Sequence, residues 1–255
     1  MSLPNSPLLI KIAAYLELFR VSNLPTVWMN GVAACLLSGG ELFSLKMPLL
    51  LIALSMVYCG GMAMNDCLDA TADAVTRPDR PIPSGMITPW EGHRAYLALF
   101  TGAVFIFQAA GGHATALAGL VLLALVFLYN LTHKLSMLAI IPMGGCRFLI
   151  YIIIGAAFSI ALPMPLIALA GLQFGYVLLL SLLARREKGA ELAGGRLPSF
   201  SAASSRQTSL VPAMLAGIPL IDGLALALML GPLWLLAGIA GGAATAGWQR
   251  KIRGD

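Results

Sequence analysis

Hydrophobic residues form long runs in this chain, and short polar segments separate the runs. A helix that crosses the hydrocarbon core of a bilayer needs about 20 mostly apolar residues. The pattern therefore predicts an all-α fold, a polytopic membrane bundle of about eight transmembrane helices, with residues 1–255 forming a single domain. The predicted spans are residues 14–38, 46–64, 90–110, 114–131, 137–160, 165–185, 208–229 and 231–249.

The connections between these spans differ in length and polarity. Three are tight turns with almost no polar residue, at Gly111-Gly112, Leu162-Pro163 and Gly231-Pro232. Two of the others are long and charged and come after the second and the sixth span. The later one, at about 186–207, is rich in Gly, Ser and Ala, and we expect a flexible segment or a cap over a cavity there.

Composition supports the membrane assignment. Hydrophobic residues make up 59% of the chain and charged residues 11%, whereas a soluble protein carries roughly 25% charged residues. The net charge of +5 would suit a nucleic-acid-binding protein, but the basic residues lie in short segments between apolar spans and form no continuous basic stretch. The four cysteines have neither CxxC nor zinc-site spacing, so we expect them to be reduced and structural.

The basic residues are distributed unequally between the two ends of the predicted spans. In an eight-span arrangement Lys46 alone falls on one side, Arg147 lies within a span, and the other lysines and arginines fall on the opposite side. Cytoplasmic loops carry an excess of Lys and Arg, so the predicted localisation is an inner or cell membrane with both termini and the two long loops in the cytoplasm.

The first long loop holds the densest charged stretch, Asn65 to Gly85, which reads NDCLDATADAVTRPDRPIPSG. If the preceding helix continues into it, Asp66, Asp69 and Asp73 share one face because they are spaced i, i+3 and i+7. Three carboxylates on one stripe repel one another, so a cation is expected between them. Mg²⁺ is the favoured candidate, since it takes carboxylate oxygens together with substrate phosphates.

The stretch from Asn65 to Gly85 resembles the first aspartate-rich motif of the UbiA-type intramembrane prenyltransferases. The resemblance implies a helical bundle around a central cavity that opens towards the cytoplasmic side and laterally to lipid. It also implies transfer of a prenyl group from a prenyl diphosphate to a lipid-soluble or amphiphilic acceptor, with Mg²⁺ as cofactor. Four further polar residues stand where the family places polar groups: Arg20, Asn23, Tyr129 and Lys134.

The resemblance also implies roles for individual residues. Arg77 and Arg80 would hold phosphate oxygens through the planar guanidinium group, and the alternative is that both are plain anchors at the membrane surface. Asp66, Asp69 and Lys134 are the expected catalytic residues. The expected metal ligands are Asn65, Asp66, Asp69, Asp73 and Glu187, and the expected substrate-binding residues are Arg20, Asn23, Asn65, Arg77, Arg80, Tyr129 and Arg147.

Arg147 lies about ten residues inside the fifth predicted span. A charged side chain at that depth is costly and is expected to face the bundle interior or a wet cavity. It would either hold a substrate phosphate or an anion of the acceptor, or pair with a buried acid such as Glu17.

The sequence departs from the family in one place. The family carries a second motif of DxxxD type after the sixth span, where this chain has Arg185-Arg186-Glu187-Lys188. Glu187 could serve as a lone metal ligand there, or the charge of the two arginines could replace a second Mg²⁺. A ninth span, common in the family, would require a short helix within 190–207.

Three other functions compete with prenyl transfer. A relative that binds isoprenoids without transferring them would explain the missing second motif, and a small-molecule transporter would accommodate Arg147. A phosphotransferase of the CDP-alcohol type is disfavoured. Its motif needs an Asp-Gly and an Ala-Arg pair, where this chain has Cys67-Leu68 and Ala70-Thr71.

Overall fold

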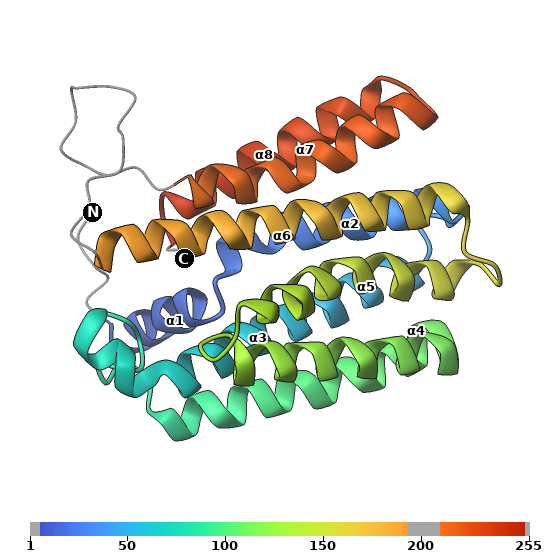
Figure 1. Cartoon of the computed structure of the whole chain (residues 1–255). Coiled ribbons are helices and arrows are strands. Elements are labelled where there is room, and N and C mark those ends of the chain that lie inside the picture. The colour runs from blue at the N-terminus through green and yellow to red at the C-terminus, as the bar shows by residue number, and fades with distance from the viewer. Residues whose placement is uncertain (1–5, 193–209, 253–255) are drawn as a thin grey trace.

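The computed structural model describes residues 6–192 and 210–252, and within these ranges the chain is a bundle of eight α-helices (Figure 1). Two short 3₁₀ turns, Val21–Asn23 and Met137–Ala139, precede the second and the fifth helix. The helices are α1 Pro7–Leu18, α2 Leu24–Leu37, α3 Lys46–Thr76, α4 Pro89–Thr132, α5 Ile140–Phe158, α6 Met164–Leu192, α7 Val211–Leu230 and α8 Leu233–Gln249.

Five of these helices are long and apolar enough to cross a membrane: α3, α4, α5 with the 3₁₀ turn before it, α6 and α7. α4 folds back on itself at Gly112, whose φ of 73° and ψ of −166° are not helical. Its two arms therefore correspond to the two spans predicted on either side of Gly111-Gly112, and Figure 1 shows them running out and back. The all-helical prediction is confirmed, whereas the count of eight spans stays a prediction. The expected short helix within 190–207 falls largely outside the described residues.

The first predicted span is not one helix, which corrects the prediction for residues 14–38. α1 ends at Leu18, and Arg20 adopts a left-handed conformation with φ 46° and ψ 47°. Pro25 then lies in the first turn of α2, where its missing N–H costs no hydrogen bond. The proline therefore marks the start of a second helix instead of a kink within one long helix.

The third helix runs further than hydrophobicity alone indicates. α3 continues past Met64 to Thr76 and thus includes the whole aspartate segment. The expectation that Asp66, Asp69 and Asp73 lie on helical spacing is confirmed.

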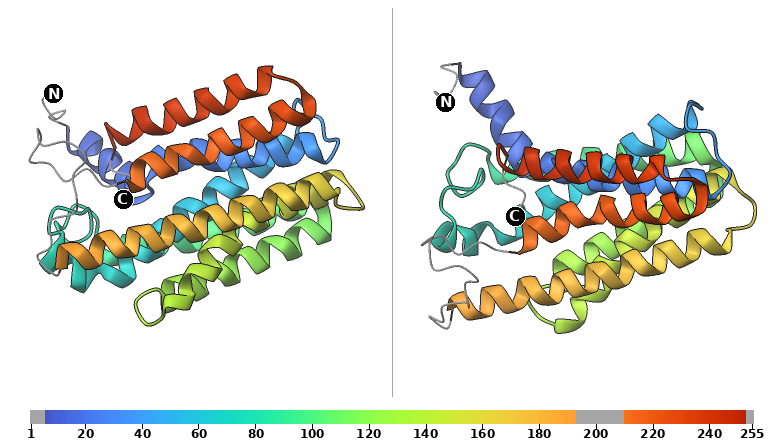
Figure 2. Two further views of the ribbon diagram at one scale, coloured as in Figure 1. Left: turned by 45° about the horizontal axis from the view of Figure 1, so that its top comes forward. Right: turned by 90° about the horizontal axis from the view of Figure 1, so that it is seen from above.

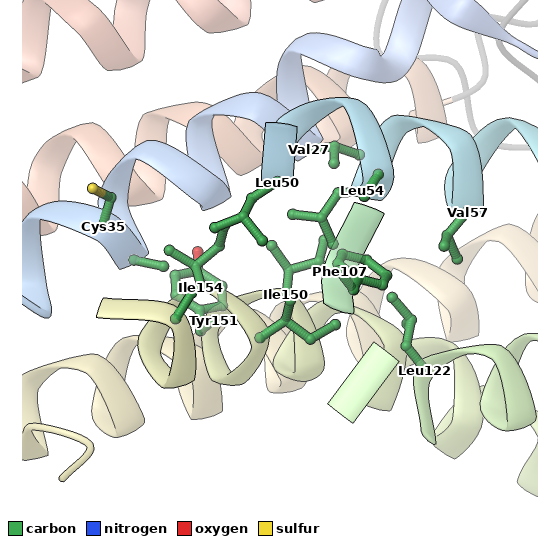
Figure 3. Close-up of a cluster of buried hydrophobic side chains, with 14 of the residues drawn as sticks. Val27, Cys35, Leu50, Leu54, Val57, Phe107, Leu122, Ile150, Tyr151 and Ile154 are labelled. Atoms are coloured by element: carbon green, nitrogen blue, oxygen red, sulfur yellow. The ribbon is translucent and has the colours of Figure 1, made fainter. Parts of the chain in front are cut away.

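The interior is apolar and joins side chains from α2 to α5 (Figure 3). Leu50 and Leu54 of α3 pack with Phe107 of α4 and Ile154 of α5, and none of the four is more than 2% exposed. The outer surface is apolar as well; Phe105, for example, is 70% exposed. An apolar exterior around an apolar core is what a helix bundle surrounded by lipid requires.

Glycines allow α7 and α8 to approach closely. A Cβ atom on Gly223 would lie 2.5 Å from the Cα atom of Gly238, so only glycine fits at this crossing. The two helices run side by side in every view (Figure 2).

The polar connections gather at one end of the bundle. The start of α1, the α3–α4 connection and the ends of α6 and α8 lie together at the left in Figure 1. The tight turn at Gly112 and the α7–α8 turn lie at the other end. Positive and acidic residues of the chain are thus concentrated where α3 ends.

Candidate active site

Asp66 lies at the centre of a cluster of charges at the end of α3. Its side chain is buried, and its Oδ1 atom accepts hydrogen bonds from Arg20 at 2.9 Å and from Arg80 at 3.2 Å. The same Arg80 nitrogen donates to Asp73 at 2.7 Å. One arginine therefore bridges two carboxylates that lie two helical turns apart, and the left-handed Arg20 supplies a second cation from the break before α2.

Asp69 is paired from a different helix. Its Oδ1 atom lies 2.5 Å from the Lys134 ammonium group, and its Oδ2 atom lies 3.4 Å from His133 Nε2, both just beyond the end of α4. Tyr129 stacks on the His133 ring with centroids 5.4 Å apart. The sequence prediction that Lys134 belongs to the same site as the aspartates agrees with this geometry. We refer to Asp66, Asp69, Asp73, Arg20, Arg80 and Lys134 as the charged cluster.

The loop after α3 brings Arg80 back under the aspartates. The chain turns at Pro78 to Gly85, where the Ser84 amide donates to the Arg80 carbonyl at 2.9 Å and Gly85 has a φ of 78°. α4 then begins with a capping box, because Thr88 and Glu91 each accept a hydrogen bond from the other residue's backbone amide. The turn and the capping box direct the chain back towards α3, and Arg80 is buried there.

A cavity of about 130 Å³ opens beside the charged cluster, between α2, α3, α4, α5, α6 and α7. Its lining is mostly aliphatic, with Leu54, Val57 and Ile150 among the lining residues. Met62 connects it to the charged cluster, because its sulfur atom accepts a hydrogen bond from Arg20 and its side chain lines the cavity. Four lining residues carry polar groups: Tyr58, Tyr129, Asn130 and Arg147.

Asn65 and Asn130 join the aspartate helix to the cavity wall. The Asn65 amide donates to Asn130 Oδ1 at 3.1 Å, and Asn130 is buried and lines the cavity. The site thus combines acidic and basic side chains at one end with an apolar cavity beside them. An amphiphile with a charged head and an apolar tail fits such a site.

Comparison with known proteins agrees with this geometry. The model of the UbiA prenyltransferase family matches residues 24–254. The chain belongs to the UbiA prenyltransferase family. The family resemblance that the aspartate segment indicated is therefore confirmed over nearly the whole length of the protein.

Relatives of this UbiA-family protein include proteins named digeranylgeranylglyceryl phosphate synthase. The one from Methanothrix thermoacetophila is 40% identical over 92 residues, which is 36% of this chain and 34% of the relative. The one from Sulfolobus acidocaldarius is 32% identical over 136 residues, or 52% of this chain and 47% of the relative. The matched segments thus span between about a third and about half of these relatives.

A solved structure has the same fold. It is described as "Structural and mechanistic insights into the biosynthesis of Digeranylgeranylglyceryl phosphate synthase in membranes", and it superposes with a TM-score of 0.63 over 94% of each chain. The sequence identity is 17%, so this likeness concerns the fold alone. Family membership and the apolar helices together identify an integral membrane protein.

Several predicted site residues of the UbiA-family protein lie outside the charged cluster. Asn23 is not among the cavity-lining residues; it accepts a hydrogen bond from Gln249 at 2.8 Å and so connects the start of α2 with α8. The Arg77 side chain is partly exposed and has no hydrogen bond or ion pair among the described residues. Glu187 accepts from the Leu210 amide at 2.9 Å and is not brought together with the aspartates.

No group of three or more His, Cys, Asp or Glu side chains in the described part of the chain is arranged to hold a metal ion by itself. Asp66 and Asp73 nevertheless each keep one carboxylate oxygen without a protein partner among the described residues. Mg²⁺ commonly uses only one or two carboxylates and completes its shell with water and substrate phosphates. The donor set therefore fits Mg²⁺ that arrives with a phosphorylated substrate.

Asp222 is the residue that sequence reasoning missed. It lies in the middle of α7 and is completely buried, where Tyr151 and Gln173 donate hydrogen bonds to its carboxylate. Arg147 has partners other than Glu17, since it donates to Asn30 and Thr26. The sequence does contain a signal for Asp222. It is a lone aspartate within the apolar run IPLIDGLAL, and an ionisable residue inside a span is rarely without a role.

Proposed function

We propose that this protein transfers a prenyl group from a prenyl diphosphate to a lipid-soluble or amphiphilic acceptor within the membrane, with Mg²⁺ as cofactor. The observation that carries the proposal is the charged cluster at the end of an apolar cavity. A prenyl diphosphate has a highly charged head and a hydrocarbon tail, so it matches both halves of this site. Family membership supports the same reaction class.

The balance of charge in the cluster favours a metal ion. Asp66, Asp69 and Asp73 are matched by the three cations Arg20, Arg80 and Lys134. A multiply negative diphosphate would therefore meet little surplus positive charge from the cluster alone. Asn65, Asp66, Asp69 and Asp73 would hold Mg²⁺, which supplies the missing positive charge and polarises the phosphate oxygens.

The side chains of the cluster would act mainly when the diphosphate leaves. Breaking the bond between the prenyl carbon and the diphosphate oxygen places additional negative charge on the leaving group. Arg80 and Lys134 are held in place by aspartates, and as cations of the cluster they would stabilise that charge. Arg77 has no protein partner among the described residues and would be available to phosphate oxygens.

Diphosphate release tests the proposal. Purified protein with a radiolabelled prenyl diphosphate and an acceptor lipid should release diphosphate only with Mg²⁺, and Asp69→Asn should lower the rate of release strongly. Glu41→Gln is the matched control, because Glu41 is exposed and belongs to the α2–α3 connection, which lies at the opposite end of the bundle (Figure 1). An activity that persists in EDTA, or that Asp69→Asn leaves unchanged, would contradict the proposal.

The names of the relatives suggest the first acceptor to test. These relatives are named as synthases of digeranylgeranylglyceryl phosphate, so an isoprenoid glycerol phosphate is the first acceptor class to supply to this chain. Formation of that product would assign the acceptor. If the protein binds the diphosphate but transfers the prenyl group to no acceptor, the non-catalytic alternative is favoured. Flux across liposomes without diphosphate cleavage would favour a transporter.

We also propose that the charged cluster and both chain ends face the cytoplasm and that eight spans form one domain. The gathering of the polar connections at one end of the bundle supports this orientation (Figure 1). Reporter fusions at residues 85 and 112 test it, because the two positions should report opposite sides of the membrane.

A further inference from the structure

A second polar group of side chains lies deep inside the bundle, away from the charged cluster. We call Asn30, Tyr151, Gln173 and Asp222 the buried polar network; they come from α2, α5, α6 and α7, and all four are 0% exposed. Asn30 donates to Asp222 Oδ2 at 2.6 Å and to the Tyr151 hydroxyl at 2.9 Å. Tyr151 and Gln173 donate to Asp222 Oδ1, Gln173 at 3.0 Å.

A carboxylate in this position is costly unless its environment compensates for it. Asp222 lies about 17 Å along α7 from the start of that helix, at the usual helical rise. Removing a charge from water is strongly unfavourable, and hydrogen bonds alone only partly offset that cost. A cation within the same network would offset much of the rest.

Arg147 is that cation, and Asn30 connects it to Asp222. Arg147 Nη1 donates to Asn30 Oδ1 at 2.8 Å, on the opposite side of the Asn30 amide from Asp222. A carboxylate accepts hydrogen bonds only, so Asp222 requires the amino group of Asn30 to face it. The Asn30 oxygen must then face Arg147. Asp222 thereby ensures that the Arg147 guanidinium group meets an acceptor, the Asn30 oxygen.

Arg147 is left with unused donors beside the cavity. Two of its five N–H groups are used, by Asn30 and by Thr26 Oγ1 at 2.8 Å. The other three have no hydrogen-bond partner among the described residues. Arg147 lines a cavity whose other lining residues are mostly apolar, so the remaining donors are available to an anion that enters the cavity.

We propose that Arg147 forms a second anion site inside the cavity, for the phosphate headgroup of a lipid, and that Asp222 is the positioning residue that holds Arg147 in place through Asn30. The site is separate from the charged cluster, whose side chains share no hydrogen bond with Arg147. The proposal rests on the proposed function in one respect, namely that the cavity admits a lipid-tailed substrate. A guanidinium group suits phosphate because its planar fork can donate two parallel hydrogen bonds.

Ligand-dependent thermal stabilisation of the purified protein tests this inference without turnover. The probes are dodecyl phosphate, dodecanol as the same chain without the anion, and inorganic diphosphate as an anion without the chain. Dodecyl phosphate should stabilise the wild type more than dodecanol does. Arg147→Met should abolish that difference, and Asp222→Asn should weaken the apparent affinity for dodecyl phosphate about tenfold.

A double-mutant cycle separates positioning from a general structural role. The variant with both Arg147→Met and Asp222→Asn should bind dodecyl phosphate no more weakly than Arg147→Met alone, because Asp222 acts only through Arg147. Thr245→Val is the control for loss of a buried polar group, since Thr245 is completely buried and bonds only to a carbonyl oxygen of its own helix. It should leave binding unchanged.

Three results would overturn the inference: unchanged binding in Asp222→Asn, additive losses in the double variant, or an equal dependence on Arg147 for inorganic diphosphate. The last result would assign Arg147 to the head of the prenyl diphosphate. If Asp222→Asn does not fold, Asn30→Ser breaks the same connection and should weaken binding equally. Failure of the wild type to release diphosphate would refute the proposed function, while the binding cycle would still decide the role of Asp222.

Discussion

The charged cluster and the buried polar network are built in opposite ways. The cluster lies at the end of the bundle, where Arg20, Arg80 and Lys134 approach the aspartates from separate segments and pair with them directly. The network lies inside the bundle, where Asp222 and Asn30 are bonded by side chains from other helices. The cluster can therefore exchange its partners for those of a substrate, whereas the network is suited to holding one arrangement.

Loss of Asp66 should have the largest effect on activity. Asp66→Ala removes the carboxylate shared by Arg20 and Arg80, together with a proposed metal ligand. We expect the rate of diphosphate release to fall about 1,000-fold, which corresponds to about 4 kcal/mol of transition-state stabilisation. Steady-state kinetics measures the effect, and a loss below about tenfold would remove Asp66 from the site.

Loss of Asp222 should affect stability more than any change in the charged cluster. Asp222→Ala leaves the donors of Asn30, Tyr151 and Gln173 without their acceptor and Arg147 without its counter-charge. We expect the free energy of unfolding to fall by about 3 kcal/mol. Denaturation in mild detergent measures it, with Thr245→Val as the reference. Equal stability of the two variants would refute the contrast between the two regions.

Lys134 should contribute to activity to an intermediate degree. The Lys134 side chain is half exposed, so Lys134→Met should cost little stability. The value of kcat/KM should fall about tenfold, because one cation near the leaving diphosphate is lost. Lys134→Arg keeps the charge and should recover most of the activity; no recovery would show that the charge is not what matters.

Arg77 should have the smallest effect of these residues. Its side chain is partly exposed and lacks a partner among the described residues, so water would screen its action on a phosphate. Arg77→Gln should raise KM less than about threefold, and the difference should vanish at high salt. A much larger effect that salt does not reduce would place Arg77 inside the site.

The sequence predicts the charged cluster better than the network, for a physical reason. Helical spacing reveals that Asp66, Asp69 and Asp73 share a face, and the same motif carries Arg80. The network joins residues as far apart as Asn30 and Asp222, and no local pattern encodes that distance. The break between α1 and α2 at Arg20 was not predicted either. Apolar residues continue on both sides of it, so hydrophobicity alone does not reveal the turn in the backbone.

The central claim is that the charged cluster holds a diphosphate while the attached hydrocarbon lies in the cavity. A structure with Mg²⁺ and a prenyl thiodiphosphate that resists cleavage tests this most directly. The account predicts the diphosphate between Asp66, Asp69 and Arg80, with the tail against Leu54 and Ile150. A diphosphate bound at Arg185 and Arg186, or a tail lying outside the cavity, would contradict it.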